Sequence, residues 1–582
     1  MKQEKVMKTK KAIRCLLAGC IAATSFMGVA CSGKGGSDSP NTLEIYCWLQ
    51  GFGDEWLLGT IDLFKQQSWV QEKYPDLEIE YESDGYASTA TNRLYNQKDN
   101  TTDLMFSSEG VGYNTDKYYL TNLTEAVYLT EVPGEGGLIM DKLPQTVKDS
   151  LVRTDAEERT DGYENYYALK YVDMVYAFMY NADLFEQFNL PLPVTTTEFS
   201  NVCDVIEDTG YSYTVDGKTT QSNTSLMVSG KHSYIQHAFP MYWAQYEGID
   251  KYEDYFKGQV NGRVSNEITQ QKGRLRALEQ MEDILQNHSY EYVGSVEYLD
   301  AQSRFLGGEG IFHWNGDYFT TEMALTRKAY ENKGISYDIR TFAAPVISSI
   351  VERLSFYDEP IRTTPEYPYA SFYQQKTPYK ELGKAKQEAY DAVLAAVIRE
   401  IDAGVSFVDS TAKSTNGYIV SQSDWDIIKE AREIKANRQI PAQEAVIPSN
   451  TPAKELAADF LRFMYTDIAI ENFSKCSGGI SFPALYYGEL NETEFEAATE
   501  GLETEAKTKF ELLFKKNAKH IPAENQFLFG KAGLKKLMYS GNLGLALSST
   551  ESNRDTAKKL FEADIAYWSG DTWTSLCQIV GV

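Results

Sequence analysis

Residues 163–185 read YENYYALKYVDMVYAFMYNADLF, and this stretch is the most informative part of the sequence about the fold. Tyr, Val, Phe and Met dominate it, and neither Gly nor Pro interrupts the run between Tyr166 and Tyr180. Aromatic and β-branched residues favour strands over helices. Because one strand usually holds about five or six residues, the run predicts two strands. We therefore expect the chain to cross here from one lobe to another.

Two charged residues, Lys170 and Asp173, interrupt this apolar run. A charge in such a stretch either faces water or occupies a defined polar site, because burying an unpaired charge is costly. We expect the crossing to pass through the floor of a ligand cleft, with both charges facing that cleft. For Asp173, an ion pair that ties the two lobes together is the alternative interpretation.

The N-terminus has the features of an export signal. Basic residues between Lys2 and Arg14 precede a short apolar segment that ends in small residues at Ala30. Gly28-Val-Ala-Cys31, followed by a Gly/Ser-rich tether to residue 40, resembles a bacterial lipobox. By that resemblance residues 1–30 are removed, and Cys31 carries the lipid that anchors the protein to the outer face of the bacterial cell membrane. An ordinary signal peptide or a short anchor helix is the alternative.

The net negative charge of the chain limits the classes of ligand and macromolecule that the protein is expected to bind. The 582 residues carry a formal net charge of −27, and removal of the basic leader makes the remainder more negative. Nucleic acid is excluded because its binding needs a basic surface. Polyanionic ligands are disfavoured for the same reason, so the expected ligand is neutral or cationic. No apolar span after the signal predicts a transmembrane helix.

Cysteine and histidine give no metal or cofactor signal. Four cysteines remain after processing, and they are far apart without a Cys-x-x-Cys pair: Cys47, Cys203, Cys476 and Cys577. We expect buried free thiols. The spacing of His232 and His237 is poor for a metal site. No metal ion and no cofactor is expected.

The order of strands and helices predicts an α/β architecture. Strand patterns at 41–49, 77–81 and 103–106 alternate with helical patterns, which indicates a mainly parallel sheet. In such sheets ligands bind beyond the carboxyl ends of the strands, where the loops 50–56 and 107–110 lie. Further along, residues 266–287, 378–402 and 492–515 read as helices, and Thr451 with Pro452 reads as the start of another.

Taken together, these features resemble an extracellular solute-binding protein of a carbohydrate ABC transporter, the family that includes maltose-binding protein. The resemblance rests on the lipobox and on four further motifs, at residues 74–79, 103–106, 179–185, and 305–310 taken with 446–461. It implies two α/β lobes with mainly parallel sheets, flanking helices and a ligand cleft between the lobes. The expected division is 41–168 and 320–447 in the first lobe, and 169–319 and 448–582 in the second.

The same resemblance implies a monomeric receptor that captures an oligosaccharide and delivers it to permease subunits of the transporter. Aromatic rings stack on the apolar faces of sugars, and carboxylates and amides bond the hydroxyls. The Trp314-Asn-Gly-Asp-Tyr318 corner matches the place of a stacking aromatic in the family. The candidate ligand contacts are Phe52, Trp56, Ser108, Glu109, Tyr171, Asp173, Tyr242, Trp243, Trp314, Asp317 and Tyr318. For each aromatic residue among them, packing in the core is the alternative.

Enzyme signatures are missing from the sequence. It contains no Gly-x-Ser-x-Gly, no His-Glu-x-x-His and no P-loop motif. We expect no enzymatic activity. Paired carboxylates can support glycoside hydrolysis, so a surface glycoside hydrolase or lyase is the second hypothesis. A glycan-binding surface lipoprotein outside transport is the third.

Overall fold

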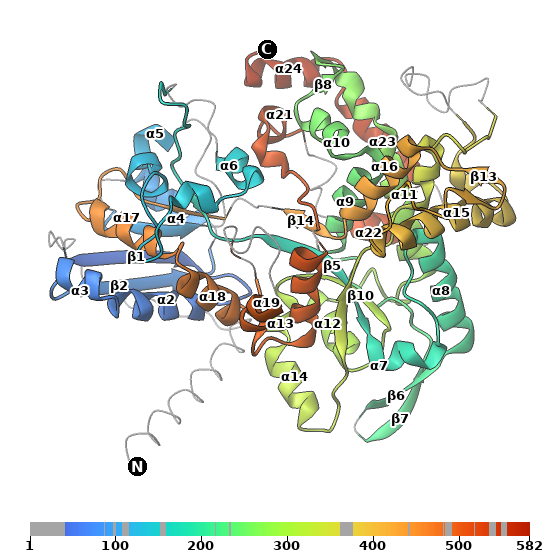
Figure 1. Ribbon diagram of the computed structural model, residues 1–582, viewed down its shortest axis with the longest axis horizontal. Helices are drawn as coiled ribbons and strands as arrows, with labels where there is room; N and C mark the ends of the chain where they lie inside the picture. Colours follow the sequence, from blue (N-terminus) through green and yellow to red (C-terminus); the bar gives the residue numbers. More distant parts are fainter. Residues whose placement is uncertain are drawn as a thin grey trace.

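The computed structural model describes residues 41–582 except 87, 97–99, 108–115, 152–158, 216, 232–233, 361–375, 440–442, 481, 483–491, 517, 535–542 and 549–555. The signal, Cys31 and the tether lie outside the described residues. The described chain forms two lobes, each built around its own sheet (Figure 1). Among these residues no helix combines the length and apolarity needed to cross a membrane.

The sheet of the first lobe has the order β2-β1-β3-β15-β4. Its strands are β1 (Thr42–Trp48), β2 (Glu78–Asp84), β3 (Leu104–Ser107), β15 (Glu444–Val446) and β4 (Leu169–Lys170). β1 runs parallel to β2 and β3, whereas β15 is antiparallel to β3 and β4. The carboxyl ends of β1 and β3 therefore meet at one edge, as expected for a ligand-binding α/β lobe.

Helices of the first lobe pack closely because a glycine permits it. α2 (Glu55–Lys65) follows β1 and buries Trp56 and Phe64, and α18 (Asp467–Cys476) packs against it. At Gly59 a Cβ atom would collide with Asn472 of α18. Asn472 donates a hydrogen bond of 2.8 Å to the carbonyl of Trp56. The close approach fixes α2, and with it the loop that joins α2 to β1.

The sheet of the second lobe is centred on β5 (Met174–Asn181). β10 (Phe312–Gly316), β11 (Ile339–Phe342) and β14 (Asn437–Gln439) all pair with β5 in the antiparallel sense. The expected parallel pairing therefore holds for β2-β1-β3 and not for the pairs made by β5. The helices around this sheet include α8 (Thr196–Thr209), α9 (Ala238–Glu247), α11 (Lys272–Asn287), α15 (Lys384–Asp402) and α16 (Gln422–Glu433).

The stretch 163–185 crosses between the lobes, as predicted. Its first strand, β4, completes the first sheet, and its second, β5, forms the centre of the second sheet. The chain returns between β14 and β15. It then leaves the first lobe again after α18, because α20 (Thr504–Phe510) packs on β11, where Thr341 N donates to Thr508 Oγ1 at 2.7 Å.

Strand pairing divides the chain differently from the expected boundaries. β11, β14, α15 and α16 belong to the second lobe, although 320–447 was expected in the first. α17 (Lys454–Phe463) and α18 belong to the first lobe, although 448–582 was expected in the second. The reason is that lobe membership is set by pairing with β3 or β5, which lie hundreds of residues away. The local sequence pattern does not predict which distant strand or helix a segment will pack against.

Several helices are shorter than their sequence patterns predict. Residues 266–270 form a 3₁₀ turn before α11, and α15 begins at Lys384 rather than at 378. The pattern at 492–515 is split into α19 (Glu492–Thr499), α20 and a π-helical turn at 511–515. α17 begins after Ala453, and Thr451 caps the turn before it by accepting a hydrogen bond of 3.0 Å from Ala453 N.

The cysteines make no disulfide in the described chain. All four are free, which agrees with the expected thiols, and burial raises the pKa of Cys203. Cys47 and Cys203 are buried, but Cys476 is exposed and Cys577 is half-buried.

Candidate functional site

The loop after β1 meets the second lobe directly. Gln50 links both lobes, because its Nε2 donates to the hydroxyl of Tyr171 at 3.0 Å and its Oε1 accepts from the hydroxyl of Tyr318 at 3.1 Å. At Gly51 a Cβ atom would lie 3.0 Å from Cδ1 of Tyr318. The missing side chain thus lets the backbone of the first lobe approach an aromatic ring of the second.

Aromatic stacks continue from this loop. The ring of Phe52 stacks on that of Tyr318 at 5.9 Å and 5°, across the lobes. Behind it, Trp56 stacks on Tyr171 at 5.6 Å, and Phe473 meets both Phe52 and Trp56 edge-on. Three predicted site residues are nearly inaccessible, at 3% exposure for Phe52, 1% for Trp56 and 0% for Tyr171, whereas Tyr318 is half-buried.

A carboxylate completes this contact region. Glu322 ends α13 (Phe319–Glu322), and its two oxygens accept hydrogen bonds from Tyr234 Oη at 2.8 Å and Gln302 Nε2 at 2.7 Å. Burial raises the pKa of Glu322, against the hydrogen bonds that lower it. The rings of Tyr234 and Tyr318 stack at 6.4 Å. We call the whole set the interlobe seam: Gln50, Phe52, Trp56, Tyr171, Tyr234, Tyr318 and Glu322.

Gln50, Tyr234 and Glu322 were not among the predicted site residues. Gln50 opens the loop that the sequence did place at the site. Glu322 lies four residues after Tyr318, which is one helical turn, so the periodicity could have suggested it. Tyr234 carries no local signal, because its neighbours along the chain do not reveal that it reaches Glu322 from 88 residues away.

Asp317 holds the end of β10 in place. Its Oδ2 accepts a hydrogen bond of 2.8 Å from Val175 N, and its Oδ1 pairs with Lys509. Lys509 also bonds the carbonyl of Gly479. Burial raises the pKa of Asp317, and Lys509 opposes this rise. Both carboxylate oxygens of Asp317 are therefore used to fix the turn that positions Tyr318.

The charges of the predicted crossing are both paired. Lys170 bonds Glu444 at 2.7 Å, and the two side chains are 3% and 2% exposed. Asp173 bonds Arg438 at 2.7 Å and His520 at 3.2 Å. Burial would raise the pKa of Asp173, but the charge of Arg438 and the contacts with Arg438 and His520 outweigh it and hold the pKa well below its ordinary value.

These pairs join the two crossing segments. Lys170 and Asp173 flank the first crossing, and their partners Glu444 and Arg438 flank the return crossing. Asp173 and Arg438 both belong to the β5–β14 side of the second sheet, and Lys170 and Glu444 both lie in the first sheet, so each ion pair holds the two crossing segments together within one lobe rather than joining the lobes. Both charges of the crossing are satisfied by these partners, and a ligand contact for Asp173 stays a prediction.

Three predicted site aromatics lie inside the second lobe. Tyr242 and Trp243 are 0% exposed within α9, and Trp243 Nε1 donates to Gln271 at 3.0 Å. Trp314 is 1% exposed, and its Nε1 donates to the carbonyl of Tyr234 at 2.9 Å. Trp314 therefore helps to fix the backbone of Tyr234, which is a seam residue. A ligand contact for these three residues stays a prediction. Ser108 and Glu109 lie outside the described residues.

Comparisons with known proteins give the fold. No family model matches the chain, and no curated protein matches its sequence. Among solved structures, the maltose-bound MalE3 of T. maritima is 13% identical, covers 91% of this chain and 100% of its own, and gives a TM-score of 0.50. A probable secreted solute-binding lipoprotein from Streptomyces coelicolor is 11% identical, with 91% and 100% coverage and a TM-score of 0.49. A chitin oligosaccharide binding protein is 14% identical, with 90% and 98% coverage and a TM-score of 0.49. The MalE3 match shows that the chain has the two-lobed fold of periplasmic binding proteins.

Proposed function

We propose that the protein is an oligosaccharide receptor, anchored by lipid on the outer face of the cell membrane, that delivers its ligand to the permease of an ABC transporter. The observation that carries this proposal is the interlobe seam, where aromatic rings and hydroxyl-binding groups from both lobes meet at the ends of β1 and β10. The fold of MalE3, a protein solved with maltose bound, supports it.

The chemistry of the seam suits a neutral sugar. Phe52 and Tyr318 present flat faces to one another, and a pyranose ring offers apolar C–H faces of similar size. Gln50 and Glu322 supply an amide and a carboxylate beside these rings, and such groups accept or donate hydrogen bonds to hydroxyls. None of the seven seam residues carries a positive charge, and Lys509, which holds the neighbouring Asp317, is neutralised by it. An anionic sugar would therefore find no free cation at the described seam.

The receptor captures its sugar by opening and closing the two lobes. The Gln50–Tyr318 hydrogen bond and the Phe52–Tyr318 stack join residues of different lobes, so they break when the lobes open. A sugar that enters replaces these contacts with its own, and it favours closure because it bonds both lobes at once. The closed form is what a permease would recognise. The tether after Cys31 gives the anchored receptor freedom to reach it.

The test is a binding screen with the mature chain. Isothermal titration against α-gluco-, β-manno- and xylo-oligosaccharides should find at least one micromolar or tighter ligand, with an uronate oligomer of equal length showing no heat of binding. Chromatography of the same mixtures should show no product. Turnover of any sugar would favour the hydrolase or lyase hypothesis, and absence of binding to every oligosaccharide would contradict the proposal. In cells, Cys31→Ala should move the protein from the membrane fraction to the medium.

A further inference from the structure

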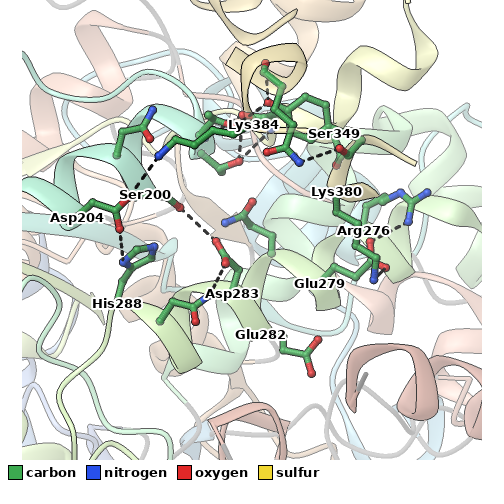
Figure 2. Close-up of a pocket in the computed structure, with 18 of the residues that line it drawn as sticks. Ser200, Asp204, Arg276, Glu279, Glu282, Asp283, His288, Ser349, Lys380 and Lys384 are labelled. Carbon is green, nitrogen blue, oxygen red and sulfur yellow. Dashed lines mark hydrogen bonds and ion pairs between the residues drawn. The ribbon is translucent and has the colours of Figure 1, made fainter. Parts of the chain in front are cut away.

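A second polar site lies on the far side of the second lobe. A pocket of about 530 Å³ is formed there by α8, by α11 from Arg276 to its end, and by residues from 348–349 and 379–388 (Figure 2). Its lining is charged rather than aromatic, which distinguishes it from the seam. Asp204, Asp283 and His288 lie at one end of the pocket.

Three potential metal ligands converge at that end. Asp204 and Glu207 are three residues apart on α8, so they share a helix face. His288 follows the last residue of α11. Its Nδ1 lies 3.3 Å from Oε1 of Glu207 and 4.0 Å from Oδ1 of Asp204. One ligand atom from each of the three side chains lies within 4.8 Å of the other two.

These separations are close to those of a tetrahedral site. Metal–ligand bonds of about 2.0–2.1 Å place the ligand atoms of a tetrahedron about 3.3 Å apart. The contact between His288 and Glu207 already has this length, and Asp204 Oδ1 needs to approach His288 Nδ1 by less than 1 Å. Asp204 is exposed, so its side chain is free of packing that would resist the movement. The pocket supplies room for water as the fourth ligand.

The surroundings hold the two inner ligands in place. Ser225 Oγ lies at hydrogen-bond distance from Glu207 Oε1 and 2.7 Å from the carbonyl of His288. That carbonyl also accepts a hydrogen bond of 3.1 Å from Leu226 N. His288 is 5% exposed. Such supporting contacts orient the ligands of metal sites.

An ion pair between His288 and Glu207 would explain only part of this arrangement. One carboxylate satisfies an imidazolium, yet a second carboxylate, Asp204, is directed to the same nitrogen at 4.0 Å. The other oxygen of Asp204 lies 4.0 Å from Lys384, which is too far for a hydrogen bond. A cation shared by all three side chains accounts for their convergence.

We propose that Asp204, Glu207 and His288 bind a divalent transition-metal ion, with Zn²⁺ as the best fit. Imidazole nitrogen is a ligand that zinc accepts readily, whereas Ca²⁺ and Mg²⁺ prefer oxygen ligands alone. The ion would join α8 to the end of α11 and so stabilise the second lobe. This site is independent of sugar binding at the seam.

The test is titration of the full mature chain with Zn²⁺ alone. Calorimetry should show one site, and His288→Gln should weaken it at least tenfold. Asp283→Asn is the matched control, since Asp283 lines the same pocket and bonds Ser200 and Asn287 without joining the three ligands. It should leave zinc affinity unchanged. Zinc should also raise the melting temperature of the wild type and not of His288→Gln.

Two further measurements keep the result interpretable. The Co²⁺-loaded protein should show visible bands without the charge-transfer absorption of a thiolate, which would reveal binding at a cysteine instead. If His288→Gln does not fold, as judged by circular dichroism, Glu207→Gln replaces it. Equal zinc affinity in wild type and variant, a thiolate band, or no zinc binding would each overturn the proposal.

Discussion

The interlobe seam and the interior of the second lobe use the same kinds of residue for different ends. In the interior, the ring of Trp243 is enclosed by Tyr252 at 4.6 Å and Tyr255 at 4.8 Å, all from α9 and the adjoining α10 (Ile249–Phe256). In the seam, Phe52 and Tyr318 come from different lobes. Interior rings therefore separate only when the lobe unfolds, whereas seam rings separate when the lobes move apart.

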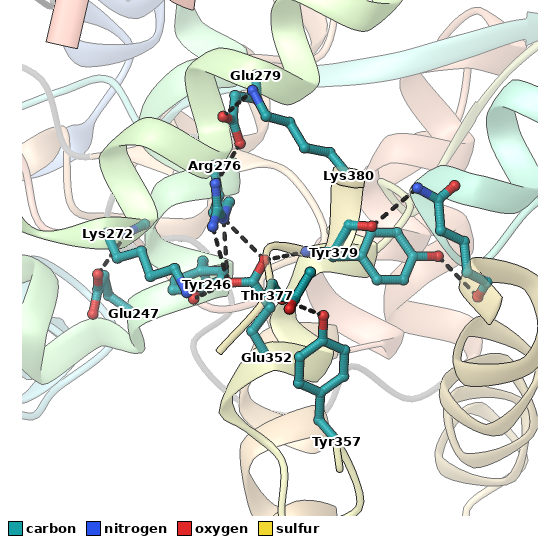
Figure 3. A network of polar contacts seen from close by, with 12 residues as sticks. Tyr246, Glu247, Lys272, Arg276, Glu279, Glu352, Tyr357, Thr377, Tyr379 and Lys380 are labelled. Carbon is teal, nitrogen blue, oxygen red and sulfur yellow. Dashed lines mark hydrogen bonds and ion pairs between the residues drawn. The ribbon is translucent and has the colours of Figure 1, made fainter. Parts of the chain in front are cut away.

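Buried charge shows the same contrast. In the interior, the side chain of Glu352 is 1% exposed and is held by Arg276 at 3.0 Å, by Lys272 and by the backbone N of Tyr379 at 2.7 Å (Figure 3). In the seam, Glu322 is half-buried and bonds only neutral donors. A buried carboxylate that is paired with cations stabilises the folded state and is not available to a ligand. A carboxylate that bonds only neutral donors can exchange those donors for the hydroxyls of a ligand. Residue type alone therefore does not tell whether an aromatic ring or a carboxylate stabilises the fold or binds a ligand. Three experiments test this distinction between the seam and the interior.

The largest expected effect is on stability, at Glu352. Replacement by Ala leaves the buried Arg276 and the half-buried Lys272 without this carboxylate, and breaking a buried pair in this way costs about 3–5 kcal/mol. Urea denaturation should show the loss, and ligand affinity of the folded fraction should be unchanged. Glu388→Ala, an exposed carboxylate on α15, is the control and should stay within about 0.5 kcal/mol of wild type. A selective loss of affinity in Glu352→Ala would remove the distinction between the two regions.

The next effect is a pH dependence at Asp391, also in the interior. Burial raises the pKa of Asp391 to about 7, although Thr195 and Ser348 donate hydrogen bonds to it at 2.7 Å. Because the folded pKa exceeds the unfolded one, the folded state binds this proton more tightly. The stabilisation is complete below pH of about 4 and is lost as the pH rises to about 7, a change of order 4 kcal/mol.

The measurement is denaturation of wild type and Asp391→Asn between pH 4.5 and 7.5. Asn mimics the protonated acid, so the variant should gain stability relative to wild type as the pH rises. A difference that stays constant across this range would show that Asp391 has an ordinary pKa.

The smallest expected change in free energy is at the seam, where it appears in binding. Tyr318→Ala removes the ring that stacks on Phe52 and the hydroxyl that bonds Gln50. Sugar affinity should fall at least tenfold, which is about 1.4 kcal/mol or more, while the free energy of unfolding changes by only about 1 kcal/mol. Tyr292→Ala, an exposed tyrosine of the second lobe, should change neither quantity. Unchanged affinity in Tyr318→Ala would exclude Tyr318 from the site.

Sequence reasoning located the seam better than it located the individual contacts. The loop at 50–56 was predicted from its place at the carboxyl end of a strand, and the corner at 314–318 from the family resemblance. Both lie at the seam. Trp314 was the leading candidate, and its side chain is buried in the second lobe, where its Nε1 donates to the backbone carbonyl of Tyr234. The periodicity of a strand tells which residues share a face, but not which face meets the other lobe.

From the sequence alone, the length of the aromatic run at 163–185 predicted two strands, and the family resemblance made it a crossing between two α/β lobes. The sequence also singled out Lys170 and Asp173 as charges that either face water or occupy a defined polar site, since burying an unpaired charge is costly. Only the tertiary structure decided what those partners are. Asp173 pairs with Arg438 and His520, which are 265 and 347 residues away along the chain. Pairing across such separations depends on how the strands assemble, and it was the antiparallel pairing of β14 with β5 that brought Arg438 beside this carboxylate.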